Sequence, residues 1–361
     1  MSSIGFPDAV RLYFYAVKLI FLPFLVELSG RMQTIAITMG DAAGIGPEII
    51  AAAWQQLQAI PDCRIVIYGH PEIIQRAANL RNIKFPIDCI NCCPDDVLAV
   101  APRTIDARAG NAAYHAIRRA IDDAKNKTVD AIVTAPIHKA ALHLAGYPYP
   151  GHTEIFAEHC GVEDYAMMLY LGPGDNINGP YGLAVVHVTL HTAMKTIFEQ
   201  ITPESVLAKI RLADGFMRKM MGQDGCLPKI GVCSLNPHAG EEGLFGNEEI
   251  TTIRPAIERA IAEGLQVEGP KPADTIMLDA QAGRYDAVVA MFHDQGHIAL
   301  KLLGMYRAVN ITLGLPIIRT SVAHGTAFDK AWQGVADPGS LIEAVRVARA
   351  LTKTQDRKSP P

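Results

Sequence analysis

Short apolar stretches of strand length recur along the chain from Met32 onward, and amphipathic segments of helix length lie between them. Six apolar stretches are expected to form buried strands: Thr34–Met39, Arg64–Tyr68, Asp130–Val133, Leu183–Leu190, Lys229–Leu235 and Asp286–Phe292. Four segments with apolar residues at helical spacing are expected to form helices: Asn111–Lys127, Pro203–Met221, Asn247–Glu263 and Ser340–Leu351. Strands that alternate with helices of crossover length predict an α/β fold with mostly parallel sheets.

The first 31 residues do not follow this pattern. Their apolar stretch, Leu12–Val26, contains Lys18 and Pro23 and is shorter than the roughly 20 residues needed to span a bilayer. Residues 27–31 match the small-residue cleavage site of a signal peptide only weakly. We therefore expect the domain to begin at Met32, after an N-terminal extension.

Composition narrows the function classes. The chain has 361 residues, 49% hydrophobic and 19% charged, and this length favours two lobes. The net charge of -4 comes without clustered lysine or arginine, so nucleic acid and membranes are not expected partners. The chain has seven cysteines, an odd number that does not predict a disulfide framework. The Cys89-x-x-Cys92 pair is not followed by the second pair that a zinc site would need. These features favour a cytoplasmic protein that acts on a small molecule.

Polar side chains recur directly after the predicted strands. The positions are Gly40 and Asp41, Thr134 to Lys139, His191, Asn236 to His238, and His293 to Gln295. In open α/β sheets, ligands bind at the carboxyl ends of strands, so these groups are expected to meet in one crevice. The first of them begins a strand-to-helix turn, with Pro47 in the first helical turn and Glu48 near the positive end of the helix dipole. The turn matches neither the dinucleotide fingerprint nor a P-loop.

Three of these positions carry histidines that could bind a metal. His191, His238 and His293 would supply three nitrogen ligands and leave a coordination position open for substrate. His187 lies four residues before His191 on the same face of the predicted strand, so spacing alone does not choose between the two.

Lys301, Asn310 and Arg319 are candidates for binding a phosphate or a carboxylate through charge-assisted hydrogen bonds. Arg319 directly follows the apolar segment Ile311–Ile318, where an unpaired charge would be costly. This setting favours a ligand-binding role over a surface ion pair.

Five motifs, taken together, resemble those of the 4-hydroxythreonine-4-phosphate dehydrogenase family. They are Gly40–Glu48, Gly151–Glu154, Asn236–Glu241, His293–Gly296 and Asn310–Pro316. The resemblance runs from about Met32 to the last predicted helix, and several motifs in order make it specific. It implies a two-lobed α/β fold similar to isocitrate and isopropylmalate dehydrogenases, with mostly parallel sheets. It also implies NAD or NADP, a divalent metal such as zinc, cobalt or magnesium, and a homodimer with its active site at the subunit interface.

The resemblance also implies roles for individual residues. It selects His191 over His187 as the metal ligand beside His238 and His293. The implied substrate contacts are His152, Thr153, Lys301, Asn310 and Arg319. The implied cofactor contacts are His324, Gly325, Thr326, Ala327 and Asp329. A cofactor-side lobe is expected at residues 32–145 and 300–355, and a substrate, metal and dimerisation lobe at residues 146–299.

The sequence departs from the family pattern at Ala42, Ala323 and Trp332, where proline, aspartate and glycine are usual. The stretch His293–Lys301 is more similar to the family's second branch, which acts on threonate or erythronate 4-phosphate, than to the vitamin B6 branch. The implied substrate is 4-hydroxythreonine 4-phosphate or D-threonate or D-erythronate 4-phosphate. A related enzyme of aromatic dihydrodiol catabolism shares the Gly-His-Ile of this stretch, so an aromatic cis-dihydrodiol carboxylate is an alternative.

The implied reaction is an oxidation followed by decarboxylation. A metal would lower the pKa of the substrate hydroxyl, the nicotinamide would accept the hydride, and the resulting β-keto acid would lose carbon dioxide. Lys301 or Asp294 is expected to transfer the protons. The rival functions are a metal-dependent hydrolase or lyase without NAD, and a non-catalytic sensor of sugar acids built on an enzyme fold.

Deletion of residues 1–31 should leave a soluble, active dimer, because the core pattern and every candidate functional residue begin after that segment. Size-exclusion chromatography and a turnover assay of the truncated protein would measure this. Insolubility together with loss of activity would show instead that the extension packs on the domain.

Overall fold

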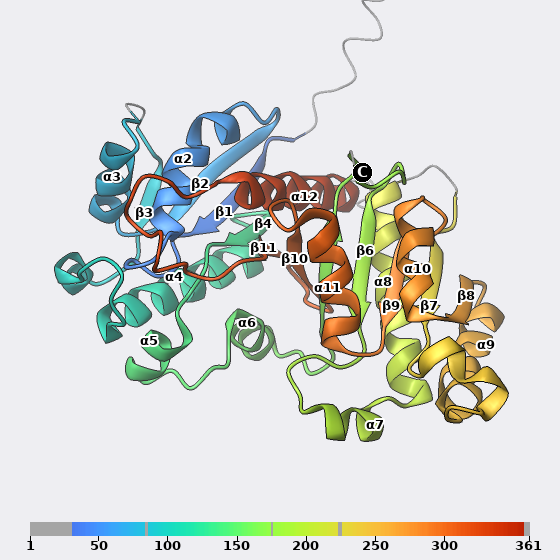
Figure 1. Cartoon of the computed structure of the whole chain (residues 1–361). Helices are drawn as coiled ribbons and strands as arrows, with labels where there is room; N and C mark the ends of the chain where they lie inside the picture. The colour runs from blue at the N-terminus through green and yellow to red at the C-terminus, as the bar shows by residue number, and fades with distance from the viewer. Residues whose placement is uncertain (1–30, 84–85, 175, 223–225, 357–361) are drawn as a thin grey trace, which may run out of the picture. The chain divides into compact units, whose positions relative to one another are not determined.

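The computed structural model describes residues 31–83, 86–174, 176–222 and 226–356. Contacts group the chain from Gln33 onward into one unit, and residues 1–30 of the predicted extension lie outside the described part. This unit is built on a sheet of 11 strands in the order β3-β2-β1-β4-β11-β10-β5-β6-β9-β7-β8 (Figure 1). None of the helices in the described ranges is long and apolar enough to cross a membrane.

One half of the sheet comes from the N-terminal part of the chain. Its parallel strands are β1 (Gln33–Thr38), β2 (Cys63–Gly69), β3 (Cys89–Asn91) and β4 (Ala131–Thr134). The helical segments of this part are α2 (Gly46–Gln58), α3 (Pro71–Leu80), η2 (Asp95–Ala99), α4 (Ala107–Lys125), α5 (Lys139–Leu144) and α6 (His152–Cys160). The strands are apolar on both faces because helices cover both sides of a parallel sheet.

The other half comes from the middle of the chain. Its strands are β5 (Ala166–Leu171), β6 (Leu183–His187), β7 (Lys229–Cys233), β8 (Gln266–Lys271) and β9 (Ala287–Ala290). The accompanying helical segments are η3 (Met194–Thr196), α7 (Ile197–Gln200), α8 (Pro203–Met221), η4 (Pro237–Gly243), η5 (Glu249–Ile253), α9 (Arg254–Ala262), α10 (Ala273–Gln281) and α11 (His293–Gly304).

Two strands from the C-terminal part join the halves. β10 (Val309–Leu313) and β11 (Ile318–Val322) form an antiparallel pair, β11 runs parallel to β4, and β10 runs antiparallel to β5. The pairs β11-β10, β10-β5 and β5-β6 are antiparallel, and the other seven pairs of the described sheet are parallel. The last helix, α12 (Gly339–Asp356), packs against β4, β10 and β11 (Figure 1).

The predicted α/β fold with a mostly parallel sheet is confirmed, and each of the six predicted strands overlaps an observed one. Each predicted helix is also found, although Asn247–Glu263 divides into the π-helical turn η5 and the α-helix α9. The apolar segment Ile311–Ile318 differs from the expectation of one run, because it holds the end of β10, a turn at Gly314 with φ of 88°, and the start of β11. The division into two lobes stays a prediction.

Two helix glycines give a matched test of the packing. A Cβ built on Gly110 of α4 would lie 2.1 Å from the carbonyl oxygen of Ala141 in α5, whereas Gly215 of α8 has no atom within 4 Å of its built Cβ. Gly215→Ala should therefore stabilise the protein by about 0.5–1 kcal/mol, the ordinary helix-propensity gain. Gly110→Ala should destabilise it by about 1–3 kcal/mol through overpacking. Urea unfolding of both variants checks the pair, and a gain in both would contradict the close contact of α4 with α5.

Candidate active site

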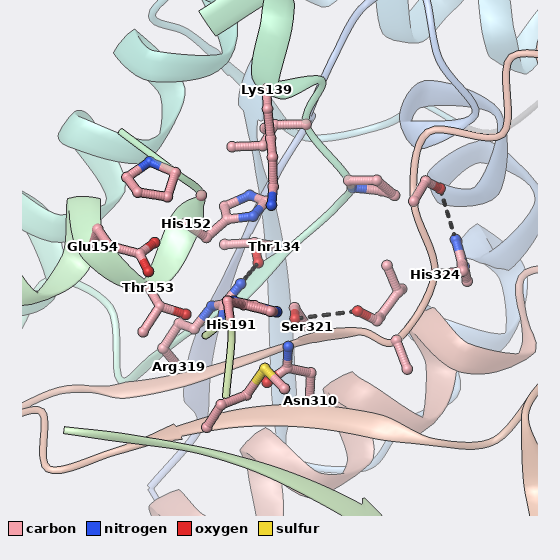
Figure 2. Close-up of a pocket in the computed structure, with 18 of the residues that line it drawn as sticks. Thr134, Lys139, His152, Thr153, Glu154, His191, Asn310, Arg319, Ser321 and His324 are labelled. Carbon is pink, nitrogen blue, oxygen red and sulfur yellow. Dashed lines mark hydrogen bonds between the residues drawn. The ribbon is translucent and has the colours of Figure 1, made fainter. Parts of the chain in front are cut away.

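A pocket lies over the central strands of the sheet, and its floor is set by strand register. Ser321 of β11 is opposite Thr134 of β4, and Asn310 of β10 is opposite both Ser321 and Leu169 of β5. Residues opposite each other project from the same face, so these four side chains form one row across the sheet. All four line the pocket (Figure 2). Thr320, the residue before Ser321, projects from the other face, where its hydroxyl donates to the carbonyl of Ala344 in α12 at 2.9 Å.

Arg319 is buried in this floor with 2% of its surface exposed. Its guanidinium donates from Nη1 to Oγ1 of Thr312 at 2.9 Å and from Nη2 to Oγ1 of Thr134 at 2.7 Å, and it lies 5.5 Å from the ring centre of Phe156. Burial lowers the pKa of Arg319 to about 9, so the group remains protonated at neutral pH. Among the described residues no carboxylate forms an ion pair with it, and Nε has no hydrogen-bond partner. A buried cation of this kind favours an anionic ligand.

The start of α6 forms a second wall. His152 is the first residue of the helix, and Thr153 and Glu154 follow it into the lining of the pocket (Figure 2). Burial, followed by the charge of Arg319, lowers the pKa of His152 well below its usual range, so its imidazole is neutral at pH 7. Its buried Nε2 has no hydrogen-bond partner among the described residues. The free N–H groups at a helix start add to the preference for an anion.

Four histidines gather at the edge of the pocket. His191, from the loop after β6, and His297, from α11, line the pocket directly. The ring of His293 lies between them, with its centre 5.8 Å from that of His191 and 3.8 Å from that of His297. His187 lies behind His297, with ring centres 4.6 Å apart. Burial lowers the pKa of His297 to about 4 and lowers the pKa values of His187 and His191, so these three rings are neutral.

Two of the three predicted metal ligands already have a carboxylate beside the inner ring nitrogen. Nδ1 of His293 lies 2.7 Å from Oδ1 of Asp294, and Nδ1 of His238 lies 3.1 Å from Oε1 of Glu241. A carboxylate at Nδ1 fixes the proton there and leaves Nε2 as the coordinating atom, which is the usual outer arrangement of a metal-bound histidine. The donor chemistry of these residues therefore suits a divalent metal.

His238 does not join His191 and His293 within one chain. It lies in η4, in a left-handed backbone conformation with φ of 52°, and its side chain is 65% exposed beside Phe245. Within the described residues, no three His, Cys, Asp or Glu side chains are grouped as they would be around a metal ion. The ligand set inferred from the sequence thus stays a prediction.

The segment predicted to bind the cofactor packs on the Gly40–Glu48 turn. The amide of Ile45 donates to the carbonyl of Thr326 at 3.0 Å, and a Cβ on Gly44 would lie 3.0 Å from Cβ of Thr326. The indole of Trp332 donates to the carbonyl of Ala42 at 2.9 Å. The family departures at positions 42 and 332 therefore contact each other. At the front of the segment, His324 and Gly325 line the same pocket as Arg319 (Figure 2).

The predicted site residues divide into two groups. The pocket lining includes His152, Thr153, His191, Asn310, Arg319, His324 and Gly325. Other predicted residues are not part of it: Lys301, Asp294, His238, His293, Thr326, Ala327 and Asp329. Asp294 contacts His293, and its role in proton transfer stays a prediction.

The sequence gives no individual role to five polar lining residues, Thr134, Lys139, Glu154, Ser321 and His297. All of these except Ser321 stand in segments that contain other candidate residues, so their neighbours are a usable signal. Ser321 becomes a site residue only through its register with Thr134 and Asn310, because the sequence pattern does not separate β10 from β11.

Known proteins are similar to this chain over most of its length. The family model of the pyridoxal phosphate biosynthetic protein PdxA matches residues 61–348. The D-threonate 4-phosphate dehydrogenase of Pectobacterium atrosepticum is 42% identical over 335 residues, which cover 88% of this chain and 99% of that protein.

Two solved structures are also similar. The 4-hydroxythreonine-4-phosphate dehydrogenase from Klebsiella pneumoniae has a TM-score of 0.76 at 40% identity, covering 89% of this chain and 99% of that one. The terephthalate 1,2-cis-dihydrodiol dehydrogenase from Burkholderia xenovorans LB400 has a TM-score of 0.62 at 31% identity, covering 90% of this chain and 99% of that one.

Proposed function

The chain belongs to the PdxA family and is a dehydrogenase that acts on a CH–OH group, and on that premise we propose that it oxidises D-threonate 4-phosphate. The oxidised product is a β-keto acid, which then loses carbon dioxide. NAD or NADP and a divalent metal are the proposed cofactors. D-Erythronate 4-phosphate and 4-hydroxythreonine 4-phosphate are chemically close enough to be tested beside it.

Arg319 is the observation that supports a phosphorylated substrate. Its guanidinium is buried, charged and without a carboxylate partner among the described residues. The hydroxyls of Thr134 and Thr312 accept from it, so each can donate its own hydrogen to an anion at the same place. With the helix start at His152 on the adjoining wall, the pocket offers several donors around one anion.

His191, His238 and His293 are the proposed metal ligands. When bound, a divalent metal supplies Lewis-acid polarisation of the substrate hydroxyl, and NAD(P) supplies the hydride acceptor. The carboxylates of Asp294 and Glu241 orient two of these imidazoles, and the pKa of His191 is lowered, so all three can present a lone pair.

A second copy of the chain is the proposed means of completing this site. The exposed ring of His238 is accessible to another protomer, and two exposed apolar residues follow it in the chain, Leu244 and Phe245, of which Phe245 lies beside the ring. Such exposed apolar groups are typical of an interface. This supports a homodimer whose active site combines residues of both subunits.

Residues 324–329 are proposed to bind the nicotinamide cofactor. His324 and Gly325 share a pocket with Arg319, so a cofactor on this segment lies beside a substrate held by the arginine. The hydrogen bond from Ile45 to Thr326 and the contact of Trp332 with Ala42 support the segment from behind. Such rigid support favours hydride transfer because it reduces misalignment of the two reactants.

A substrate panel tests the proposed function. Reduced-nicotinamide absorbance would be followed with the three 4-phosphorylated acids, with NAD and NADP, and with unphosphorylated D-threonate as control. Turnover restricted to the phosphorylated acids supports the proposal. Oxidation of an aromatic cis-dihydrodiol carboxylate instead would favour the second candidate, which the similarity to the terephthalate dihydrodiol dehydrogenase suggests.

Removal of metal should abolish turnover, and zinc, cobalt or magnesium should restore it. His238→Ala should weaken metal binding by at least about tenfold, because loss of a direct ligand costs at least as much metal affinity as loss of the group that hydrogen-bonds to the ligand. His187→Ala is the matched control and should leave the metal nearly intact. Metal content and calorimetric titration measure both variants. Equal metal loss in the two would contradict the ligand assignment.

Arg319→Lys should reduce kcat/KM for the phosphorylated substrate by about 1–3 kcal/mol in activation free energy, since lysine cannot reproduce paired hydrogen bonds to phosphate. The KM for the nicotinamide should barely change, and the effect should shrink with an unphosphorylated analogue. Steady-state kinetics with both substrates varied would measure this. A change that appears first in the nicotinamide KM would assign Arg319 to the cofactor instead.

A further inference from the structure

His297 lies between the pocket and a buried histidine. It lines the pocket from the second turn of α11, and the residue is 6% exposed. Its ring stacks on that of His293 with an angle of 13° between the planes. Its Nδ1 lies 3.1 Å from Nε2 of His187 and 3.2 Å from the carbonyl oxygen of His293.

These two contacts determine which nitrogen of His297 carries the hydrogen. Two imidazole nitrogens 3.1 Å apart need one hydrogen between them, and the carbonyl of His293 can only accept. A hydrogen on Nδ1 of His297 satisfies both contacts, whereas a hydrogen on Nε2 of His187 would leave two lone pairs facing each other at the carbonyl. With the hydrogen on Nδ1, the Nε2 atom of His297 is an acceptor, and none of the described residues hydrogen-bonds to it.

His187 is held rigidly enough to impose this arrangement. It is the last residue of β6 and is 1% exposed. A Cβ on Gly296 would lie 2.4 Å from Nε2 of His187, so the glycine allows α11 to approach the histidine closely. The neighbouring residues Gly296 and His297 thus both pack against His187 at the end of β6.

We propose that His297 binds a hydroxyl group of the substrate through Nε2, and that His187 is a positioning residue that acts through His297. The inference rests on the proposed function and adds a contact to it. A substrate anchored by its phosphate at Arg319 still has hydroxyl groups on neighbouring carbons, and an acceptor in the same pocket selects a ligand that can donate there. The competing role for His297 is only to support His293 by stacking.

The test compares two ligands that differ in hydroxyl groups alone. D-Threonate 4-phosphate and 4-phosphonooxybutanoate, its analogue without hydroxyls, would be titrated calorimetrically into the metal-loaded full chain, with inorganic phosphate as a third probe. The variants are His297→Leu, which removes the acceptor, His297→Gln, whose amide oxygen can reach the position of Nε2, and His187→Leu. Metal content is measured for every sample.

His297→Leu should weaken binding of D-threonate 4-phosphate roughly three- to tenfold, the worth of one neutral hydrogen bond. It should change binding of the hydroxyl-free analogue and of phosphate by less than about twofold. His297→Gln should recover most of the loss, and His187→Leu should reproduce part of it with metal content unchanged. An equal loss for both organic ligands, a fall in metal content in His297→Leu, or no loss at all would overturn the inference.

Failure of the proposed function gives a different result. If the unaltered protein does not bind D-threonate 4-phosphate but oxidises D-erythronate 4-phosphate or 4-hydroxythreonine 4-phosphate, the proposed substrate is wrong. The His297 comparison then uses that substrate against the same hydroxyl-free analogue. A loss specific to the hydroxylated ligand still supports His297, and its absence rejects it.

Discussion

Burial of the Arg319 guanidinium in the middle of the sheet is the constraint on which the site depends. An arginine without water needs acceptors at fixed positions, and two threonine hydroxyls on different strands provide them. Thr312 comes from β10 and Thr134 from β4, so the arginine is held only when β11 lies between these strands in its observed register. A shift of one residue would turn Arg319 toward α12, where apolar contacts replace both hydroxyls.

The antiparallel strands at the centre of the sheet determine where the pocket lies. In a fully parallel sheet, the residues after successive strands would form the site at one edge. Here β10 and β5 run against their neighbours, so the pocket floor is the face of the strands themselves, with Asn310 and Leu169 beside Ser321. Segments from either half of the sheet then supply the walls: the start of α6 lies on one side, and His191 of the loop after β6 and His297 of α11 lie on the other. The floor and the walls of the pocket therefore come from different parts of the chain.

The regular part of the fold could be predicted from the sequence because it depends on local pattern. Runs such as Ile65–Tyr68 and Ala287–Phe292 are apolar without interruption, which is typical of strands buried on both faces. β10 and β11 could not be separated in this way, since Ile311–Ile318 is apolar across the turn at Gly314. The histidines and other polar residues of the site could be found because they follow predicted strands. Arg319 could be found because it follows an apolar segment of the sequence. Contacts such as Thr134 with Arg319 depend on register over 185 positions, which no local pattern contains.

The two histidines near the end of β6 lie in different surroundings, a difference that their spacing in the sequence does not reveal. His187 and His191 are four residues apart, which on an extended strand would place them on one face. The strand ends at His187, so His191 belongs to the following loop and is free to enter the pocket. His187 stays inside, where Nε2 of its ring lies 3.1 Å from Nδ1 of His297. The strand stops between the two histidines, so one of them stays in the interior and the other reaches the lining of the pocket.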